Sequence, residues 1–227
     1  MCGRKTLSKD IASIIKEMDI EEWEAHDYKP NYNIAPMSSS PVIIKDKVKK
    51  TKMMRWGLIP SWSKNDHLSS TMINARLETI LEKPSFSSLV HHHRCVVLVD
   101  GYYEWTKQHS QPYYITQAQN KILPLAGLWT KWENSNSDTI FSYTIITKTP
   151  IKSIKHLHNR MPFILNKNNM SKWIDCNQFS FSDCLSEIQL ENLNMKYYPV
   201  SKFVNSVKNN SKLCTKKANI AQTMNIF

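Results

Sequence analysis

Short runs of β-branched and aromatic residues, each closed by turn residues, fill the chain from residue 31 onward and constrain its fold most strongly. Such runs predict β-strands, and they cover 41–45, 52–59, 95–105, 112–116, 122–132 and 141–147. Stretches with helical character interrupt or follow them at 75–82, 85–91, 153–156, 169–175 and 182–191. This pattern predicts an α+β protein in which a mixed, largely antiparallel sheet carries peripheral helices.

A helix is predicted ahead of these strands. After a short N-terminal strand, Ser8 can cap a helix in which apolar residues from Ile11 to Met18 recur at helical spacing. The helix is expected to run to about Glu24.

The chain shows no internal repeat and no linker rich in Pro, Gly or Ser. Its 227 residues lie within the range that one mixed-sheet domain reaches. We therefore expect a single domain over 1–227, with a polar and basic tail over about 208–227 that is mobile in part.

The charge balance favours a polyanionic partner. The 30 Lys and Arg residues exceed the 19 Asp and Glu residues by 11, and this surplus suits nucleic acid first and an anionic membrane surface second. With only 4 Gly and no phosphate-binding glycine motif, ATP and dinucleotides are excluded and no cofactor is predicted. The chain has no run of about 20 apolar residues and no signal-peptide core. We expect no membrane partner and a cytoplasmic, nucleoid-associated protein.

Cysteine and histidine usage gives no sign of a metal centre. The 5 Cys form no C-x-x-C pair, which fits neither a disulfide framework nor a structural zinc site, so reduced thiols are expected. The triplet His91, His92 and His93 lacks a completing carboxylate or Cys, and adjacent side chains point apart. We predict no metal site.

Cys2 has the clearest chemical meaning. A small side chain at position two permits removal of Met1, which leaves an α-amine and a thiol on one carbon frame. Their reference pKa values are about 8 and about 8.5, so both nucleophiles are partly available near neutral pH. An aldehyde is the matching electrophile, because the amine forms an imine and the thiolate then closes a five-membered thiazolidine. The alternative is a small residue in a leading strand.

Two titratable residues are candidates for proton transfer. Glu104 lies in an aromatic strand, where burial would raise its pKa and suit imine chemistry; an outward-facing Glu paired with Lys is the alternative. His158 is two residues from Arg160, so an extended segment would place an acid and a phosphate clamp in one pocket. The alternative is a surface or core residue, which a lone His more often is.

Four further residues carry weaker signals. Asn74 and Arg76 can supply a positioning amide and a phosphate contact, or can cap and face a helix. Trp62 offers a stacking surface and Pro36 an apolar wedge between unstacked bases. Trp56 is expected in the core.

Several short segments, taken in order, resemble the SOS response-associated peptidase (SRAP) family. They lie at 1–4 (MCGR), 33–36 (NIAP), 56–60 (WGLIP), 74–79 (NARLET), 94–95 with 100–105 (RC and DGYYEW), 158–162 (HNRMP), 199–201 (PVS) and 204–205 (VN). The resemblance covers nearly the whole chain. It implies a compact α+β domain around a barrel-like sheet, and a protein that crosslinks covalently to abasic sites in single-stranded DNA; we expect a monomer.

The resemblance also implies roles for individual residues. Cys2, freed by removal of Met1, would be the nucleophile, with lyase activity competing against ring closure. Asn74 would orient the reacting group, Glu104 would shuttle protons in imine formation and its reversal, and His158 would assist opening of the sugar ring.

The implied DNA contacts form a second set. Phosphates would be contacted at Arg4, with Gly3 beside it, and at Arg76 and Arg160. Bases would be displaced or stacked at Pro36 and Trp62.

Two other function classes stay open. Cys2 with His158 as base also suits a thiol peptidase or amidohydrolase, since N-terminal nucleophiles cleave amides too. The positive charge and the Trp residues also suit a non-catalytic binder of single-stranded DNA. Turnover of a peptide or amide would favour the first class, and equal affinity for intact and abasic strands would favour the second.

Overall fold

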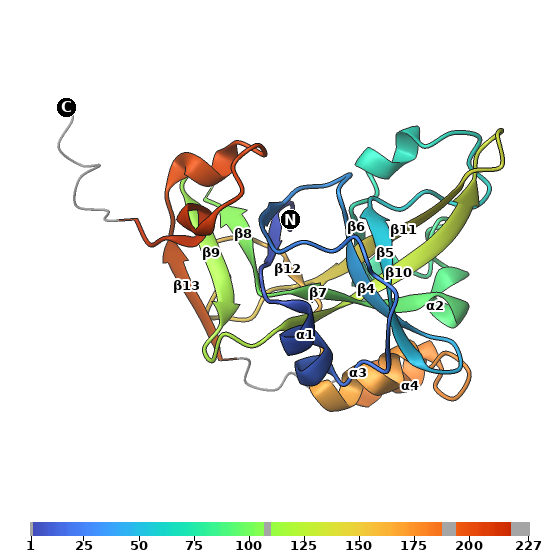
Figure 1. Ribbon diagram of the computed structural model, residues 1–227. Coiled ribbons are helices and arrows are strands. Elements are labelled where there is room, and N and C mark those ends of the chain that lie inside the picture. Colours follow the sequence, from blue (N-terminus) through green and yellow to red (C-terminus); the bar gives the residue numbers. More distant parts are fainter. Residues whose placement is uncertain (1, 107–109, 188–193, 219–227) are drawn as a thin grey trace.

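The computed structural model describes residues 2–106, 110–187 and 194–218. At its centre, five strands follow one another around a closed barrel in the order β11-β10-β7-β4-β5 (Figure 1). Neighbours in this ring are antiparallel except β5 and β11, whose parallel pairing closes it. The strands are β4 (Ser39–Lys45), β5 (Lys49–Trp56), β7 (Arg94–Val99), β10 (Leu123–Glu133) and β11 (Thr139–Lys148). The predicted mixed, largely antiparallel, barrel-like fold with peripheral helices is confirmed.

The barrel strands are rich in apolar residues because both of their faces are largely covered. Every residue of β7 is buried, and Trp56 and Tyr143 are fully enclosed, as predicted for Trp56. Inward-facing side chains fill a barrel of this size. Tyr143 brings a hydroxyl into the core, where it lies 2.8 Å from Ser40 Oγ, so these two buried hydroxyls satisfy each other.

A second sheet lies beside the barrel, at the left of Figure 1, and holds the N-terminal strand. Its antiparallel strands follow the order β13-β9-β8-β1-β3. They are β1 (Lys5–Leu7), β3 (Asn31–Ile34), β8 (Gly101–Trp105), β9 (Pro112–Gln117) and β13 (Met195–Pro199).

The chain crosses from the barrel to the second sheet at Asp100, so the single strand predicted over 95–105 is two strands. The Asp100 N–H donates to the Thr6 carbonyl at 2.8 Å, and its carboxylate accepts from the backbone and hydroxyl of Ser8. A Cβ at Gly101 would lie 2.6 Å from a backbone oxygen of β9, so only glycine permits this approach. The crossing carries Glu104 to the sheet that holds β1.

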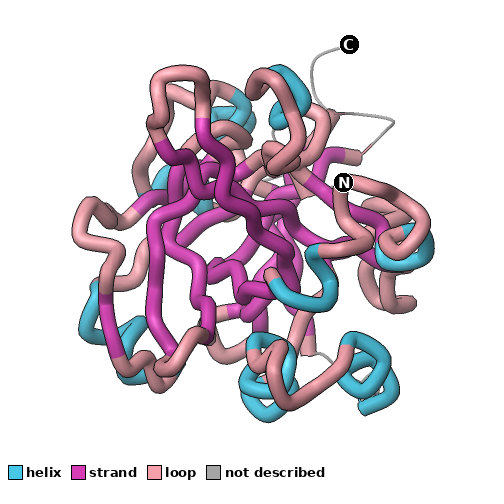
Figure 2. Tube along the Cα trace, turned by 90° about the vertical axis from the view of Figure 1, so that its right-hand side faces the viewer, coloured by secondary structure: helices cyan, strands magenta, loops and turns pink. Residues whose placement is uncertain are grey.

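Helices lie around the strands, at the periphery of the molecule (Figure 2). They are α1 (Ile11–Met18), α2 (Leu89–His92), α3 (Lys167–Ile174) and α4 (Phe181–Glu187). No helix in the described ranges is long and apolar enough to cross a membrane.

The ends of α1 differ from the prediction. Asp10 caps the helix instead of Ser8, because its carboxylate accepts from the Ser13 N–H at 2.8 Å while Ser8 bonds to the crossing turn. Asp19 adopts a left-handed conformation with φ 49° and ends the helix well before Glu24.

The predictions of helix over 75–82 and 153–156 are wrong. Strand β6 (Asn74–Arg76) pairs in parallel with β11, and a 3₁₀ turn over Leu77–Thr79 follows it. Pairing with the barrel outweighs the local helical preference. Residues 153–156 form turns. The remaining short strands are β2 (Glu22–Trp23) on β5 and β12 (Met161–Pro162) on β11.

The C-terminal segment makes contacts with the rest of the fold as far as residue 218, and the partial mobility expected of 208–227 stays a prediction. A 3₁₀ helix over Lys212–Thr215 buries Cys214 completely. Val200 and Lys217 form a β-bridge. The rest of the predicted tail, 219–227, lies outside the described residues.

Candidate functional site

Cys2 is buried beside the barrel, and β6 holds its backbone. Asn74 Nδ2 donates to the Cys2 carbonyl at 2.9 Å, and Asn74 in turn is fixed by pairing of β6 with Ile145 of β11. Within the described part of the chain, the buried Asn74 Oδ1 has no hydrogen-bond partner. The amide is therefore anchored on one side and offers an acceptor on the other.

Glu104 contributes a buried carboxyl to the same place. It lies on β8 and is only 4% exposed. Burial raises its pKa to about 7, as the aromatic strand predicted, so the group is poised to give or take a proton near neutral pH. Burial first, and the charge of Glu104 second, also raise the pKa of the Cys2 thiol. The two side chains thus act on each other electrostatically.

His158 lies in the segment between β11 and β12 and is half-buried. Its Nδ1 accepts from the backbone N–H of Arg160 at 3.0 Å. In the neutral ring, an accepting Nδ1 leaves the proton on Nε2. The backbone therefore selects the tautomer in which Nε2 donates.

Arg160 is held by an ion pair that the sequence analysis did not anticipate. Its two terminal nitrogens each lie 2.8 Å from a carboxylate oxygen of Glu78, and one also donates to the Thr147 carbonyl at 2.5 Å. Hydrogen bonding to Arg160 lowers the pKa of Glu78 to about 2. Arg76, paired in register with Thr147, is exposed at the same end of β11.

Arg4 is occupied inside the protein. Its Nη1 donates to Asn33 Oδ1 at 2.8 Å and to the Val204 carbonyl at 3.0 Å, and its guanidinium carbon lies 5.9 Å from the centre of the Trp105 ring. These contacts tie the N-terminal segment to the C-terminal one. Gly3, before it, is half-buried. The DNA contacts of Gly3 and Arg4 stay predictions.

The two residues expected to meet bases lie on loops. Pro36 forms a turn between β3 and β4 and is half-buried. Trp62 lies in the loop after β5, with 61% of its surface exposed. An exposed Trp of this kind is available for stacking.

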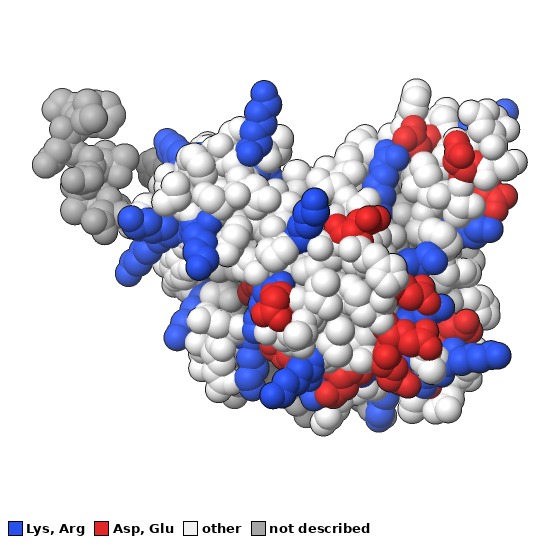
Figure 3. Space-filling model, viewed as in Figure 1, with Lys and Arg blue, Asp and Glu red and all other residues white. Residues whose placement is uncertain are grey.

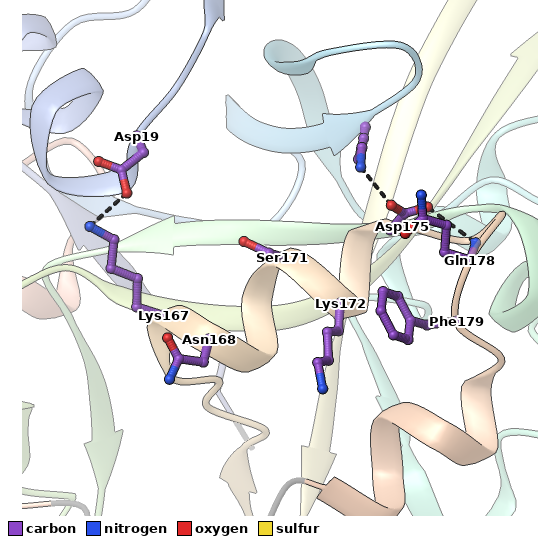
Figure 4. A pocket seen from close by; sticks show the side chains of 9 residues that line it. Asp19, Lys167, Asn168, Ser171, Lys172, Asp175, Gln178 and Phe179 are labelled. Atoms are coloured by element: carbon purple, nitrogen blue, oxygen red, sulfur yellow. Dashed lines mark hydrogen bonds and ion pairs between the residues drawn. The ribbon is translucent and has the colours of Figure 1, made fainter.

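A pocket of about 560 Å³ lies elsewhere, along α3 (Figure 4). It is lined by lysines paired with carboxylates, Lys167 with Asp19 at 2.6 Å and Lys45 with Asp175 at 2.5 Å. None of the residues predicted for the site lines it. Among the described residues, no cluster of His, Cys, Asp and Glu could hold a metal ion.

Positive charge surrounds the C-terminal segment. Figure 3 shows Lys and Arg side chains around the left-hand part of this face, where β13 lies, while acidic side chains gather at the lower right. Residues 195–218 contain no Asp or Glu. Their exposed lysines are Lys196, Lys202, Lys208, Lys212, Lys216 and Lys217.

Comparison with known proteins places this arrangement in a family. The model of the SOS response associated peptidase (SRAP) family matches residues 1–207. The chain belongs to the SRAP family.

Named relatives of this SRAP chain come from bacteria and vertebrates. The abasic site processing protein YoaM of Bacillus subtilis is 37% identical over 93% of this chain and 96% of its own length. The abasic site processing protein HMCES of Xenopus tropicalis is 37% identical over 85% of this chain and 68% of its own. A crystal structure from Bacteroides thetaiotaomicron shares the fold, with a TM-score of 0.86 and 23% identity over 96% of this SRAP chain and all of that one.

Sequence reasoning missed several polar residues of this candidate site. Lys5 and Tyr102 are fully buried, and the electrostatics of both are linked to Cys2. Glu78 and Asn33 hold the two arginines described above. Glu78 and Asn33 stand within motifs already singled out, whereas a Lys in a three-residue strand gives no signal that it is buried.

Proposed function

We propose that this protein crosslinks covalently to abasic sites in single-stranded DNA. The observation that carries the proposal is a cysteine at position two whose backbone is held by Asn74 beside the buried carboxyl of Glu104. Removal of Met1 would turn Cys2 into a 1,2-aminothiol. The names of YoaM and HMCES, both abasic site processing proteins, support the substrate.

The chemistry proceeds by two bond-forming steps. The Cys2 α-amine attacks the aldehyde carbon of the ring-opened sugar, and the carbinolamine then loses water to give a protonated imine. The Cys2 sulfur next adds to the imine carbon as the S–H proton leaves. The C=N electron pair returns to nitrogen, which closes the thiazolidine. Holding amine, thiol and aldehyde together makes the second step effectively unimolecular.

Glu104 suits the proton transfers of these steps. Loss of water needs an acid that protonates the departing hydroxyl, and reversal needs a base at the same atom. A carboxyl with a pKa of about 7 supplies both forms near neutral pH. Asn74 Oδ1, which has no hydrogen-bond partner among the described residues, can accept from the carbinolamine hydroxyl and orient it.

His158 suits the preceding step, in which the closed sugar opens. Its Nε2–H can donate to the ring oxygen as the C–O bond breaks, because Nδ1 is held as an acceptor. The imine also permits β-elimination of the 3′ phosphate. Lyase activity therefore competes with thiol capture, and the closeness of the thiol to the imine carbon favours capture.

Single-stranded DNA fits the surface around the site. The exposed C-terminal lysines attract phosphates, and Trp62 can stack on an unpaired base. Arg76 is exposed toward solvent and can meet a phosphate, whereas both terminal nitrogens of Arg160 already bond to Glu78, so a phosphate there would have to share or replace that carboxylate. We propose that the protein acts as a monomer, in the cytoplasm near the nucleoid.

The proposal is tested with the full chain, processed at Met1, and three matched oligonucleotides: abasic, intact, and abasic reduced with borohydride beforehand. On a denaturing gel, only the unreduced abasic strand should give a shifted band. Intact mass should equal protein plus DNA minus one water, as ring closure requires. No shifted band, or an equal band with the reduced strand, contradicts the proposal; peptide turnover without an adduct would instead favour the thiol peptidase.

Replacing Arg76 with alanine should weaken noncovalent DNA binding without changing the chemistry. The side chain is exposed, so folding should be unaffected. Loss of one phosphate contact should flatten the dependence of log K on log salt by about 0.7. Fluorescence anisotropy on an intact strand measures this salt slope. The control is Lys131→Ala, a substitution near the other end of β11. If Arg76→Ala left the salt slope unchanged and slowed adduct formation, Arg76 would take part in the chemistry and not in phosphate binding.

A further inference from the structure

Lys5 is a fully buried lysine near Cys2 that the steps above do not use. It lies on β1 directly opposite Tyr102 of β8, and opposite residues of an antiparallel pair share a face. Two residues further along β8, Glu104 lies on that same face, because side chains alternate. Lys5 thus shares its side of the sheet with the carboxyl of the site.

The ammonium of Lys5 is held by neutral groups. Nζ donates to Ser40 Oγ at 2.9 Å, and it lies 5.9 Å from the centres of both the Trp56 and Tyr143 rings. Within the described ranges, no carboxylate lies within ion-pair distance of it. A buried charge without an opposite charge costs free energy, so this position would be better filled by an apolar side chain if only stability mattered.

Lys5 and Cys2 influence each other's ionisation. Burial lowers the pKa of Lys5 to about 7, while a charged Cys2 raises it. In the other direction, burial and Glu104 raise the pKa of the Cys2 thiol, and the charge of Lys5 lowers it. The two groups therefore titrate as a pair in which thiolate and ammonium favour each other.

We propose that Lys5 is a positioning residue for the crosslinking reaction: its buried ammonium stabilises the Cys2 thiolate and so prepares sulfur to attack the imine carbon. The inference rests on the proposed function. As Cys2 gives up its S–H proton, Lys5 takes one up, so the neutral thiol and amine become a thiolate and an ammonium. Sulfur then bonds to carbon, the C=N electrons return to the protonated nitrogen, and Lys5 releases its proton to water.

The other titratable side chains around Lys5 cannot supply a positive charge next to the Cys2 sulfur. Burial raises the pKa values of the Tyr102 and Tyr143 hydroxyls, so both stay neutral. Asp100 and Glu104 are acidic, and a negative charge on either opposes a thiolate. Lys5 is the one basic side chain among the groups that face Cys2 from β1, β8 and β11 in the described structure.

The test measures the Cys2 thiol without DNA and the adduct with DNA. Processed protein is alkylated with iodoacetamide from pH 6 to 10, and mass spectrometry follows the N-terminal peptide. Lys5→Met should raise the midpoint of the plot of alkylation rate against pH by at least about one pH unit. At a given pH below the midpoint, this is a tenfold loss of thiolate. Adduct formation at saturating abasic strand should slow by a similar factor. Lys9→Met, on a partly exposed lysine paired with Glu17, is the matched control and should change neither.

Ser40→Ala provides a second variant if Lys5→Met fails to fold. Removing the acceptor of the ammonium should move the midpoint in the same direction by a smaller amount. If the wild-type protein crosslinks normally and the midpoint is unchanged in every variant that folds, the role of Lys5 is overturned. A raised midpoint in a protein that never forms an adduct supports the effect of Lys5 on the thiol and overturns the crosslinking function instead.

Discussion

Replacing Cys2 with alanine should abolish the stable adduct while leaving its precursor intact. Alanine at position two still permits removal of Met1, so the α-amine can form an imine with the abasic aldehyde. No sulfur is present to close the ring, and imines hydrolyse during denaturing electrophoresis. We therefore expect no band without borohydride, a band when borohydride is added during the reaction, and more strand cleavage by β-elimination than with the native chain.

Cys176→Ala is the matched control for this experiment. Cys176 is half-buried and lies between α3 and α4, away from the described site. It should crosslink at the native rate. A stable adduct that survives Cys2→Ala, or one that is lost in Cys176→Ala, would assign the nucleophile to another group. A chain that keeps Met1 behind an N-terminal tag should also form no ring, because its amine is then an amide.

The residues with intrinsic chemistry were predictable from the sequence. Cys2 stands out because only position two can carry both an amine and a thiol. The burial of Glu104 follows from its aromatic strand, and the structure confirms it. Trp56 and Trp62 also separate as expected into a core residue and an exposed one. In each case a short local pattern carries the information.

Long-range partners were not predictable in the same way. Arg4 looks like a free cation in sequence, yet its carbonyl acceptor is Val204, 200 positions away. Arg160 pairs with Glu78 across 82 positions. The helix predicted over 75–82 is wrong for the same reason, since β6 exists only where β11 is present to pair with it. Local preference cannot report contacts that the closed barrel creates.

Replacing Glu104 with glutamine should slow adduct formation by about 10²- to 10⁴-fold, the usual range for loss of a general acid or base. Glutamine keeps the shape of the side chain and removes its proton exchange, so noncovalent affinity for an intact strand should be unchanged. In the native protein, the rate of the water-loss step should fall as pH rises through about 7, where Glu104 gives up its proton. Single-turnover gels across pH 5.5–9 should show this fall in rate for the native protein. The Glu104→Gln protein should not show it.

Stability provides an independent readout of the same carboxyl. Because burial raises its folded pKa to about 7, the neutral form is favoured in the folded state, and folding loses stability as pH rises from about 4.5 to about 7. Above that window Glu104→Gln should be more stable than the native chain by up to about 3 kcal/mol, and below about pH 4.5 the two should converge. Urea unfolding at pH 4.5 and pH 8 measures this difference, with the exposed Glu82→Gln as control. Equal stability of native and Glu104→Gln proteins at pH 8 would mean that the folded protein stabilises the carboxylate anion, and such a carboxyl could not serve as the proton donor near pH 7.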